Sequence, residues 1–196
     1  MAFHLPQTKV SSFYINPICS FLYQVLDSAQ WSTLTGIKVG EELSGLILSA
    51  FSQNILTVLG EVYPEGTKAG GHISSPSDQK KIIYSKDGIV NKGTCVITFS
   101  GNVQLHVEVV NGKHTEKVLS TFPQNVKYLA GILFTCVGRG TSFHERKNAE
   151  VNAFKKYFPN IPISGFFTGG EFAQKSGEEV GGYSYSSIFC LLSLKP

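Results

Sequence analysis

The hydrophobic positions of this chain form short runs separated by glycine, proline and polar residues. Runs rich in β-branched and aromatic residues predict strands over residues 9–15, 43–51, 67–75, 93–99, 103–110 and 185–194. A helical period spans 52–62, with Ser52 as its N-cap and Pro64 beyond its end. A weaker helical pattern covers 114–126, and residues 18–29 fit either a helix or irregular chain.

The order of these elements predicts the fold class. The two strand-like runs on either side of Ser100, Gly101 and Asn102 are typical of a β-hairpin. Strands and helices are mixed along the chain, which favours an α/β or α+β fold: a mixed β-sheet with a central hairpin, covered by helices. With 196 residues, 42% of them hydrophobic, the chain is long enough for one domain, or one and a half, with a substantial core.

The stretch from Gly131 to Phe172 carries the strongest pattern. Residues 130–137 are apolar without alternation, which predicts a strand covered on both faces. Gly138 and Gly140 then interrupt this run. After a helix and another strand, the segment "GFFTGGE" at 165–171 predicts a second glycine turn. The layout of strand, glycine turn, helix, strand and glycine turn is typical of a binding site, and it also serves as plain scaffolding.

The helix in this stretch has clear boundary signals. Ser142 and Glu145 have the spacing of a capping box, which predicts a helix that begins near Phe143 and ends before Pro159. Its predicted core-facing stripe consists of Ala149, Val151, Ala153, Phe154 and Phe158.

The charge content argues against nucleic-acid binding. Charged residues make up 16% of the chain, against about 25% in typical soluble domains. The net charge is only +3, and the basic residues of 144–147, Lys155 and Lys156 alternate with Glu145 and Glu150, as on a solvated helix face. The first residues carry no charged leader, and no apolar run reaches 18 residues, so we expect a protein that is neither secreted nor membrane-spanning.

Four widely spaced cysteines, Cys19, Cys95, Cys136 and Cys190, form no C-x-x-C pair. Neither a zinc site nor a redox dithiol is predicted, and a reducing compartment, the cytoplasm or the nucleus, is expected. Cys95 and Cys190 lie inside apolar runs and are expected to be small buried side chains. Cys136 ends its strand close to Arg139, so its thiolate would be favoured and reactive if solvent reaches it.

Glycine turns invite a search for phosphate sites. A helix that begins behind "GRG" is suited to anions, and Arg139 would strengthen such a site. The dinucleotide fingerprint is excluded because Phe143 stands at its third glycine, and the phosphate loop because Gln174 stands at its second. Ser184 lacks the second glycine of a nucleophile elbow.

Acid–base and metal chemistry have weak support. Glu150 and Glu171 are candidate carboxylates, but nothing in the sequence pairs them. The five histidines have no metal-ligand spacing, and His106 is expected to be exposed on its strand. We therefore expect no catalytic activity, no metal and no cofactor.

Three segments resemble one known family. "CVGRG", "NAEVNAFKKYFP" and "PISGFFTGGE" are similar to the C-terminal FIST domain, FIST C, as found in F-box proteins that carry FIST domains. The resemblance extends weakly to "AGGHISS", "VITFSGNVQ" and "YSYSSIFCLLSL". It implies a FIST C domain over 67–196, preceded at 1–66 by a remnant of another FIST half that includes "LPQTKVSSFYI".

The resemblance implies an intracellular recognition domain. FIST domains are regarded as ligand-sensing or recognition modules, and in F-box proteins they recognise proteins that a cullin-RING ubiquitin ligase marks for degradation. No F-box is visible before residue 68. The expected partners are a protein client, ubiquitin ligase subunits and a possible small ligand. The positions that match the family are Cys136, Gly138, Arg139, Gly140, Asn148, Glu150, Gly165, Phe166, Phe167, Gly170 and Glu171.

Two hypotheses about function follow. A protein-recognition domain predicts an exposed aromatic patch near 165–171, with Phe167 and Phe172 as anchors. The alternative is that these phenylalanines belong to the core, which is favoured for Phe166. A sensor of an amino-acid-like molecule predicts a pocket into which Arg139 and Glu171 both face. Here the alternative is that these two side chains pair with each other or with solvent.

Overall fold

A computed structural model describes residues 9–15, 28–35, 38, 40–42, 44–49, 59–73, 83–85, 88–90 and 94–195. Its strands are β1 Lys9–Ile15, β2 Ser44–Ser49, β3 Lys68–Ile73, β4 Ile83–Ser85, β5 Gly88–Val90, β6 Thr94–Ser100, β7 Val103–Asn111, β8 Tyr128–Cys136, β9 Ile163–Gln174, β10 Gly181–Tyr183 and β11 Ser186–Leu194. Its helices are α1 Ser28–Thr35, α3 Thr115–Leu119, α4 Thr141–His144, α5 Ala149–Tyr157 and the 3-10 helix η3 Val137–Arg139. Residues 59–62 are also helical.

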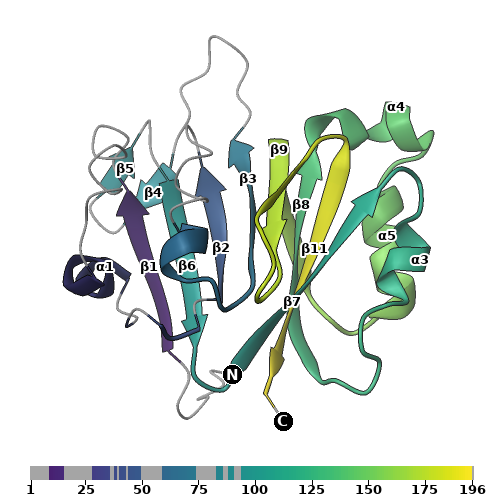
Figure 1. Ribbon diagram of the computed structural model, residues 1–196. Helices are drawn as coiled ribbons and strands as arrows, with labels where there is room; N and C mark the ends of the chain where they lie inside the picture. The colour runs from purple at the N-terminus through teal and green to yellow at the C-terminus, as the bar shows by residue number, and fades with distance from the viewer. Residues whose placement is uncertain are drawn as a thin grey trace.

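The fold is α+β, as expected, and is built on one mixed sheet (Figure 1). The strand order is β1-β6-β2-β3-β9-β8-β11-β7, with β10 paired to β9, while β4 and β5 form a separate pair. The pairs β2–β3 and β8–β9 are parallel, and the other pairs are antiparallel. All six expected strands are present, and their ends differ from the expected ends by at most two residues. The expected ranges are 9–15, 43–51, 67–75, 93–99, 103–110 and 185–194.

Strand β9 joins two halves of this sheet. Residues 163–168 pair in parallel with β8, whereas residues 168–174 pair antiparallel with β3. Since the arrows of β3 and β8 point the same way in Figure 1, the chain turns back inside β9. The turn coincides with a register shift against β3 and with a φ of 156° at Gly170, which glycine adopts without strain. The predicted second glycine turn agrees with this reversal, although the residues before and after it belong to one strand, β9.

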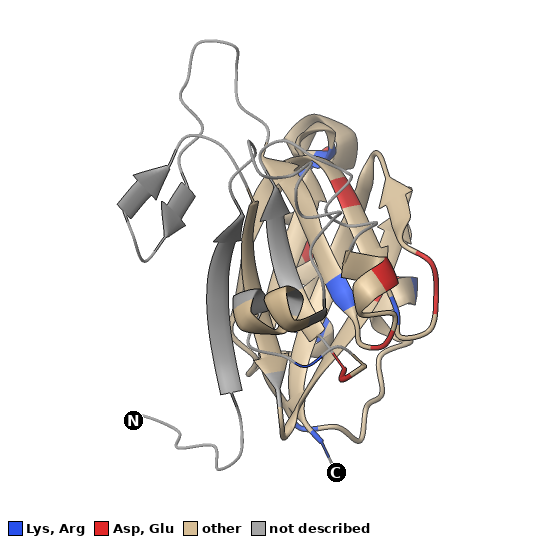
Figure 2. Cartoon of the chain, turned by 60° about the vertical axis from the view of Figure 1, so that its left-hand side comes forward, with Lys and Arg blue, Asp and Glu red and all other residues tan. Residues whose placement is uncertain are grey.

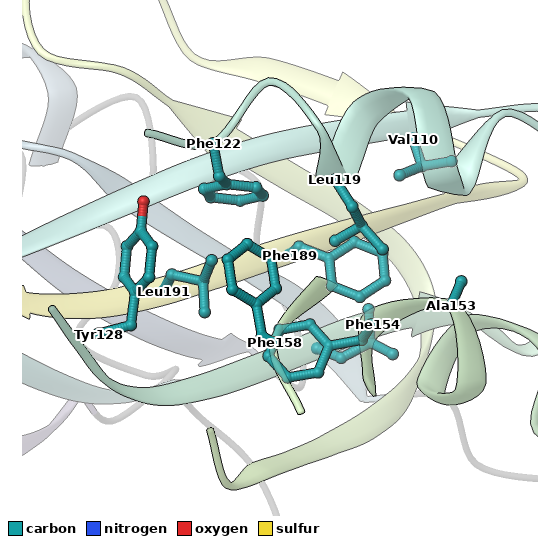
Figure 3. Packing of buried hydrophobic residues seen from close by; sticks show 10 residues of the cluster. Val110, Leu119, Phe122, Tyr128, Ala153, Phe154, Phe158, Phe189 and Leu191 are labelled. Carbon is teal, nitrogen blue, oxygen red and sulfur yellow. The ribbon is translucent and has the colours of Figure 1, made fainter. Parts of the chain in front are cut away.

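Among the described residues, two hydrophobic clusters hold the layers together. One lies between the halves of the sheet and includes Phe99, Leu105, Phe134, Ala173 and Ile188. The other lies between the right-hand half of the sheet and the helices α3 and α5 (Figure 3). In that cluster the Phe154 ring is stacked on the Phe189 ring, with centroids 6.1 Å apart. The strand β8 is therefore covered on both faces, as its unbroken apolar run predicts.

The predicted hairpin is wrong. Strands β6 and β7 both exist, but β6 pairs with β1 on one edge and β2 on the other, and β7 pairs with β11. The short connection at Gly101 and Asn102 thus carries the chain from one half of the sheet to the other. The strand pattern was visible in the sequence, whereas partner choice depends on residues far along the chain.

The helix after β8 also differs from the prediction. It is divided into α4 and α5, because Glu145 and Asn148 adopt left-handed φ values of 58° and 55°. The capping box is therefore wrong: α4 begins behind Gly140 without a side-chain cap, and Glu145 instead forms an ion pair with Lys113. The end before Pro159 is confirmed. Val151 is exposed instead of core-facing, while the rest of the predicted stripe is buried.

The remaining predictions fall partly outside the described residues. Of the predicted helix at 52–62, residues 59–62 are described and are helical, whereas Ser52 is not described. The weaker helix is confirmed in short form as α3. Residues 18–27, with Cys19, lie outside the described residues.

Candidate functional site

Arg139 and Glu150 form a buried ion pair at the end of β8. Arg139 closes η3 and Glu150 lies in the first turn of α5, and their exposed fractions are 2% and 5%. The Arg139 Nη2 lies 2.6 Å from Glu150 Oε1, and the Arg139 Nε donates to the same oxygen at 3.0 Å. Two hydrogen bonds to one ionised partner make this a strong, directional contact.

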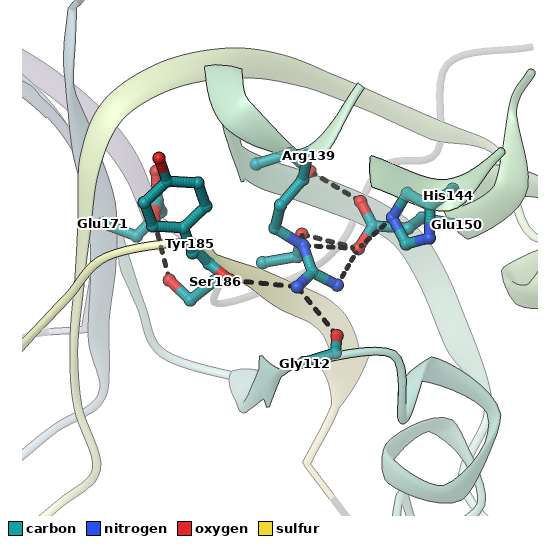
Figure 4. Close-up of polar contacts among 9 residues, drawn as sticks. Gly112, Arg139, His144, Glu150, Glu171, Tyr185 and Ser186 are labelled. Atoms are coloured by element: carbon teal, nitrogen blue, oxygen red, sulfur yellow. Dashed lines mark hydrogen bonds and ion pairs between the residues drawn. The ribbon is translucent and has the colours of Figure 1, made fainter. Parts of the chain in front are cut away.

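Further hydrogen bonds satisfy the rest of the pair (Figure 4). The Arg139 Nη1 donates to the carbonyl oxygens of Gly112, at the end of β7, and of Tyr185, just before β11. The hydroxyls of Ser187 and Thr135 donate to the Glu150 carboxylate at 2.7 and 3.2 Å. The pair therefore ties together two strand ends, the start of β11 and α5, and this network leaves little bonding capacity for a ligand.

Glu171 is a second buried carboxylate, and it does not face Arg139. It is 2% exposed and accepts hydrogen bonds from the hydroxyls of Thr168 at 2.6 Å and Ser186 at 2.7 Å. Arg139 pairs with Glu150 instead. The predicted clamp of Arg139 and Glu171 is therefore wrong, as is the alternative that they pair with each other or with solvent.

A pocket of about 490 Å³ lies beside the buried network. One wall is the outer face of β8 and β9, with Leu133, Thr135, Ile163, Gly165 and Phe167. The opposite wall is the segment that leads into α5, from Arg139 to Val151. The pocket thus lies between residues 139–151 and 163–167. The sensor hypothesis predicts a pocket between the two glycine turns, and that position is wrong.

Gly165 explains why the pocket can form there. It lies opposite Leu133 on β8, and a Cβ atom at this position would overlap the Leu133 carbonyl oxygen. Glycine therefore allows close approach of the two strands. It also leaves the wall without a side chain between Ile163 and Phe167.

The pocket has a basic side. Arg146 and Lys147 are exposed and line it, and neither forms an ion pair with any described residue. The start of α5 is next to them, with Asn148 as an N-cap that makes no side-chain cap bond. Free N–H groups at a helix start and two unpaired cations both favour negative charge.

His144 lies behind this basic side. Its side chain is only 9% exposed, and its Nε2 is 3.5 Å from Glu150 Oε1 without a hydrogen bond among the described residues. Burial lowers the pKa of His144, while the nearby Glu150 carboxylate opposes that shift.

Two adjacent phenylalanines of β9 are exposed. Phe166 is 51% and Phe167 is 63% exposed, and both line the pocket. The preference for a core role at Phe166 is therefore wrong, although its ring does stack on Phe134 with centroids 6.2 Å apart. Phe172 is 2% exposed and cannot serve as the predicted anchor.

The predicted site residues divide into two groups. The pocket brings together Arg139, Gly140, Asn148, Glu150 and Phe167, with Gly165 and Phe166. Cys136, Gly138, Gly170 and Glu171 do not line it. Cys136 is buried, which removes the solvent access that its predicted reactivity requires. The sequence assigns Arg146 and Lys147 to a solvated helix face. Their place in the pocket depends on their position beside β9, which no local sequence pattern shows.

Cys95, Cys190 and His106 do not line the pocket. Cys190 is buried, and burial raises the pKa of its thiol. Cys95 is half-buried. The prediction that His106 is exposed is wrong, because its side chain is half-buried. Its Nε2 lies 2.8 Å from the Ser193 hydroxyl. The described ranges contain no cluster of three or more His, Cys, Asp or Glu side chains suited to a metal ion. In the view of Figure 2, basic and acidic residues are interspersed along the chain.

Within the described residues, no helix has both the length and the apolar content needed to cross a membrane.

Comparison with known proteins gives a consistent family. F-box only protein 22 from Homo sapiens is 31% identical over 119 residues, which cover 53% of this chain and 28% of that relative. F-box only protein 22 from Pongo abelii has the same identity and coverage. The chain thus spans well under half the length of these relatives. The family model of the FIST C domain matches residues 48–174, which include β8, α5, β9 and all the residues that line the pocket. This chain belongs to the FIST C domain family.

Proposed function

We propose that this chain is a non-catalytic domain that recognises a protein client for ubiquitin-dependent degradation. The observation that carries the proposal is the pair of exposed rings, Phe166 and Phe167, at a pocket whose basic side chains Arg146 and Lys147 are unpaired among the described residues. Exposed aromatic side chains next to arginine are the composition of energetic centres in protein interfaces.

The family supports the protein-directed reading. The relatives at 31% identity are F-box proteins by name. By analogy, the client would be presented to a cullin-RING ubiquitin ligase, in the cytoplasm or the nucleus. Fold-level analogy is a weak guide to function by itself, so the proposal rests on the surface of β9 and α5.

The surroundings of two carboxylates support the non-catalytic part of the proposal. The two carboxylates that could act as acid or base, Glu150 and Glu171, are buried and accept hydrogen bonds from neighbouring side chains. A group in that state would have to leave its partners before it could move a proton for a substrate.

Affinity capture from cells expressing the chain tests this function. The parent should recover a discrete client that carries ubiquitin conjugates, and a Phe166→Ser/Phe167→Ser variant should lose it. The matched control is Glu116→Ser/Lys156→Ser, which removes an exposed ion pair between α3 and the end of α5. A client that is retained by the phenylalanine variant, or lost equally in the control, would contradict the proposal.

A second candidate function is the sensing of a small molecule. The pocket volume of about 490 Å³ falls within the roughly 300–1,000 Å³ of typical ligand sites. Because Arg139 and Glu171 do not face each other, an amino-acid-like ligand would have to use Arg146, Lys147 and the start of α5 instead. Thermal stabilisation of the chain by free amino acids or small carboxylic acids, lost in Arg146→Ser/Lys147→Ser, would favour this candidate.

A further inference from the structure

The first part of β9 is an open sheet edge in the part of the chain that the structure describes. Residues 163–167 pair only with β8, because the described part of β3 meets β9 from Thr168 onward and β10 meets it from Glu171 onward. From Ser164 to Phe167 every residue is exposed, and Ile163 is half-buried. An unpaired strand edge is a template for a further strand.

The backbone of this segment presents regular hydrogen-bonding groups to the open side. The Gly131 N–H donates to the Pro162 carbonyl oxygen at 2.8 Å, which sets the phase of the β8–β9 ladder. In a parallel pair, alternate residues direct both backbone groups to the same neighbour. Residues with the phase of Pro162 therefore face β8, and the N–H and C=O groups of Ile163, Gly165 and Phe167 face the open side.

The side chains along this edge separate into two faces. Phe166 is opposite Phe134 and stacks on it, on the face toward the other half of the sheet. Phe167 is opposite Thr135, on the face that lines the pocket. A strand added at this edge would place alternate side chains against Phe166 on one face and in the pocket on the other.

The charges of the pocket face select the kind of strand. Arg146, Lys147 and the start of α5 favour negative charge, and Glu150, the acidic residue that lines the pocket, is already neutralised by Arg139. An acidic side chain on the pocket face of an added strand would find unpaired cations there.

We propose that a client protein binds as an extended acidic segment that adds a strand to the edge of Ile163–Phe167. Backbone hydrogen bonds to Ile163, Gly165 and Phe167 supply the register. Acidic side chains on one face contact Arg146 and Lys147, and apolar side chains on the other face cover Phe166. This inference rests on the proposed function and names the partner's chemistry and its mode of binding.

Synthetic peptides of eight residues, capped at both ends and alternating Glu with Val or Phe, test this mode against the full chain. We expect saturable binding by fluorescence anisotropy, weakened at least about tenfold by Arg146→Glu/Lys147→Glu. A peptide with Lys in place of Glu should not bind. A peptide N-methylated at alternate residues on its pairing edge should also fail, since it cannot complete the ladder.

A matched pair of variants isolates the backbone contribution. Phe167→Ser and Phe167→Pro both remove the ring, but only proline removes the N–H that faces the open side. Proline is tolerated on a strand edge where its nitrogen faces solvent, so the fold should persist in both, as circular dichroism would verify. Phe167→Pro should bind the peptide more weakly than Phe167→Ser. Equal affinities, or binding that N-methylation leaves unchanged, would overturn strand addition.

Hydrogen exchange separates this inference from the proposed function. The peptide should slow exchange of the Ile163, Gly165 and Phe167 amides. A client that is captured in a Phe166- and Phe167-dependent manner without protection of these amides would keep the recognition function and overturn the strand-addition mode. Absence of both a client and peptide binding would overturn both, and binding of small carboxylic acids alone would assign the pocket to the sensor.

Discussion

Arg139 and Arg146 belong to the same connection between β8 and α5, and their surroundings are opposite. Arg139 is buried and donates to Glu150 and to two backbone carbonyls, so its charge is consumed inside the fold. Arg146 is exposed at the pocket and has no ion pair among the described residues. The arginine inside the glycine motif is therefore structural, and the one in the plainer segment is available to a partner.

The same contrast divides the aromatic residues of the region. Phe154 lies in the centre of the cluster between sheet and helices, while Phe167 is exposed on the pocket face of β9. A motif that is rich in glycine and arginine can thus be a device for joining strand ends, and a binding surface can lie beside it. Stability measurements can distinguish the buried network of Arg139 and Glu150 from the open edge of residues 163–167.

Replacement of Arg139 by methionine should have the largest effect. It leaves the Glu150 carboxylate buried without its cation, and removal of one partner from a buried pair costs about 3–5 kcal/mol. Chemical denaturation should show that loss in the free energy of unfolding. Arg146→Met, the control, should change it by less than about 0.5 kcal/mol. If the two variants were equally stable, Arg139 would not be the structural member of the pair.

Alanine at Gly165 should have the next largest effect. The added methyl group would overlap the Leu133 carbonyl oxygen, a backbone atom that cannot rotate away, so β8 and β9 must separate slightly. Overpacking of this kind costs about 1–3 kcal/mol. Gly182→Ala on β10 is the matched control, because nothing lies near its added methyl group. A thermal melt in which both variants match the parent would show that the strands tolerate separation.

Local patterns predicted much of the fold. Apolar runs placed β1, β2, β3, β8 and β11, and Pro159 placed the end of α5. The pairing of β6 was not predictable, because its β-branched residues suit any neighbouring strand and two distant strands occupy both of its edges. The left-handed residues that divide α4 from α5 were also hidden, since Glu145 carries no preference strong enough to announce that conformation.

The candidate site was predictable only in outline. Glycine and arginine at 138–140 correctly marked the end of β8 as part of the site. The sequence could not show that Arg139 pairs with Glu150 rather than with Glu171. Arg139 ends η3, Glu150 lies in the first turn of α5 and Glu171 lies within β9, and these elements meet only in the folded chain. The apolar strand favoured a core role for Phe166 and left Phe167 open between core and anchor, whereas both rings are exposed beside the edge of 163–167, which has no second partner among the described residues.

A smaller effect should come from His144, which borders the closed network. Burial lowers the pKa of His144 below the usual 6.5; Glu150 opposes this shift and Arg139 and Arg146 reinforce it. Since the folded protein holds this proton more weakly than the unfolded chain does, protonation favours unfolding. The stability of the parent relative to His144→Gln should therefore be greatest above pH 6.5 and fall as the pH decreases through that value. Parallel pH profiles of the two proteins would contradict the assignment.

The smallest effect on stability should come from Phe167→Ser, and that is what makes it informative. The ring is 63% exposed and belongs to neither hydrophobic cluster, so its removal should change the free energy of unfolding by less than about 0.5 kcal/mol. Phe154→Ala, at the centre of the helix-side cluster, should cost about 3–5 kcal/mol by the same denaturation measurement. A large loss in Phe167→Ser would mean that the ring supports the fold. The exposed ring would then no longer support the proposal that the edge of residues 163–167 binds a partner.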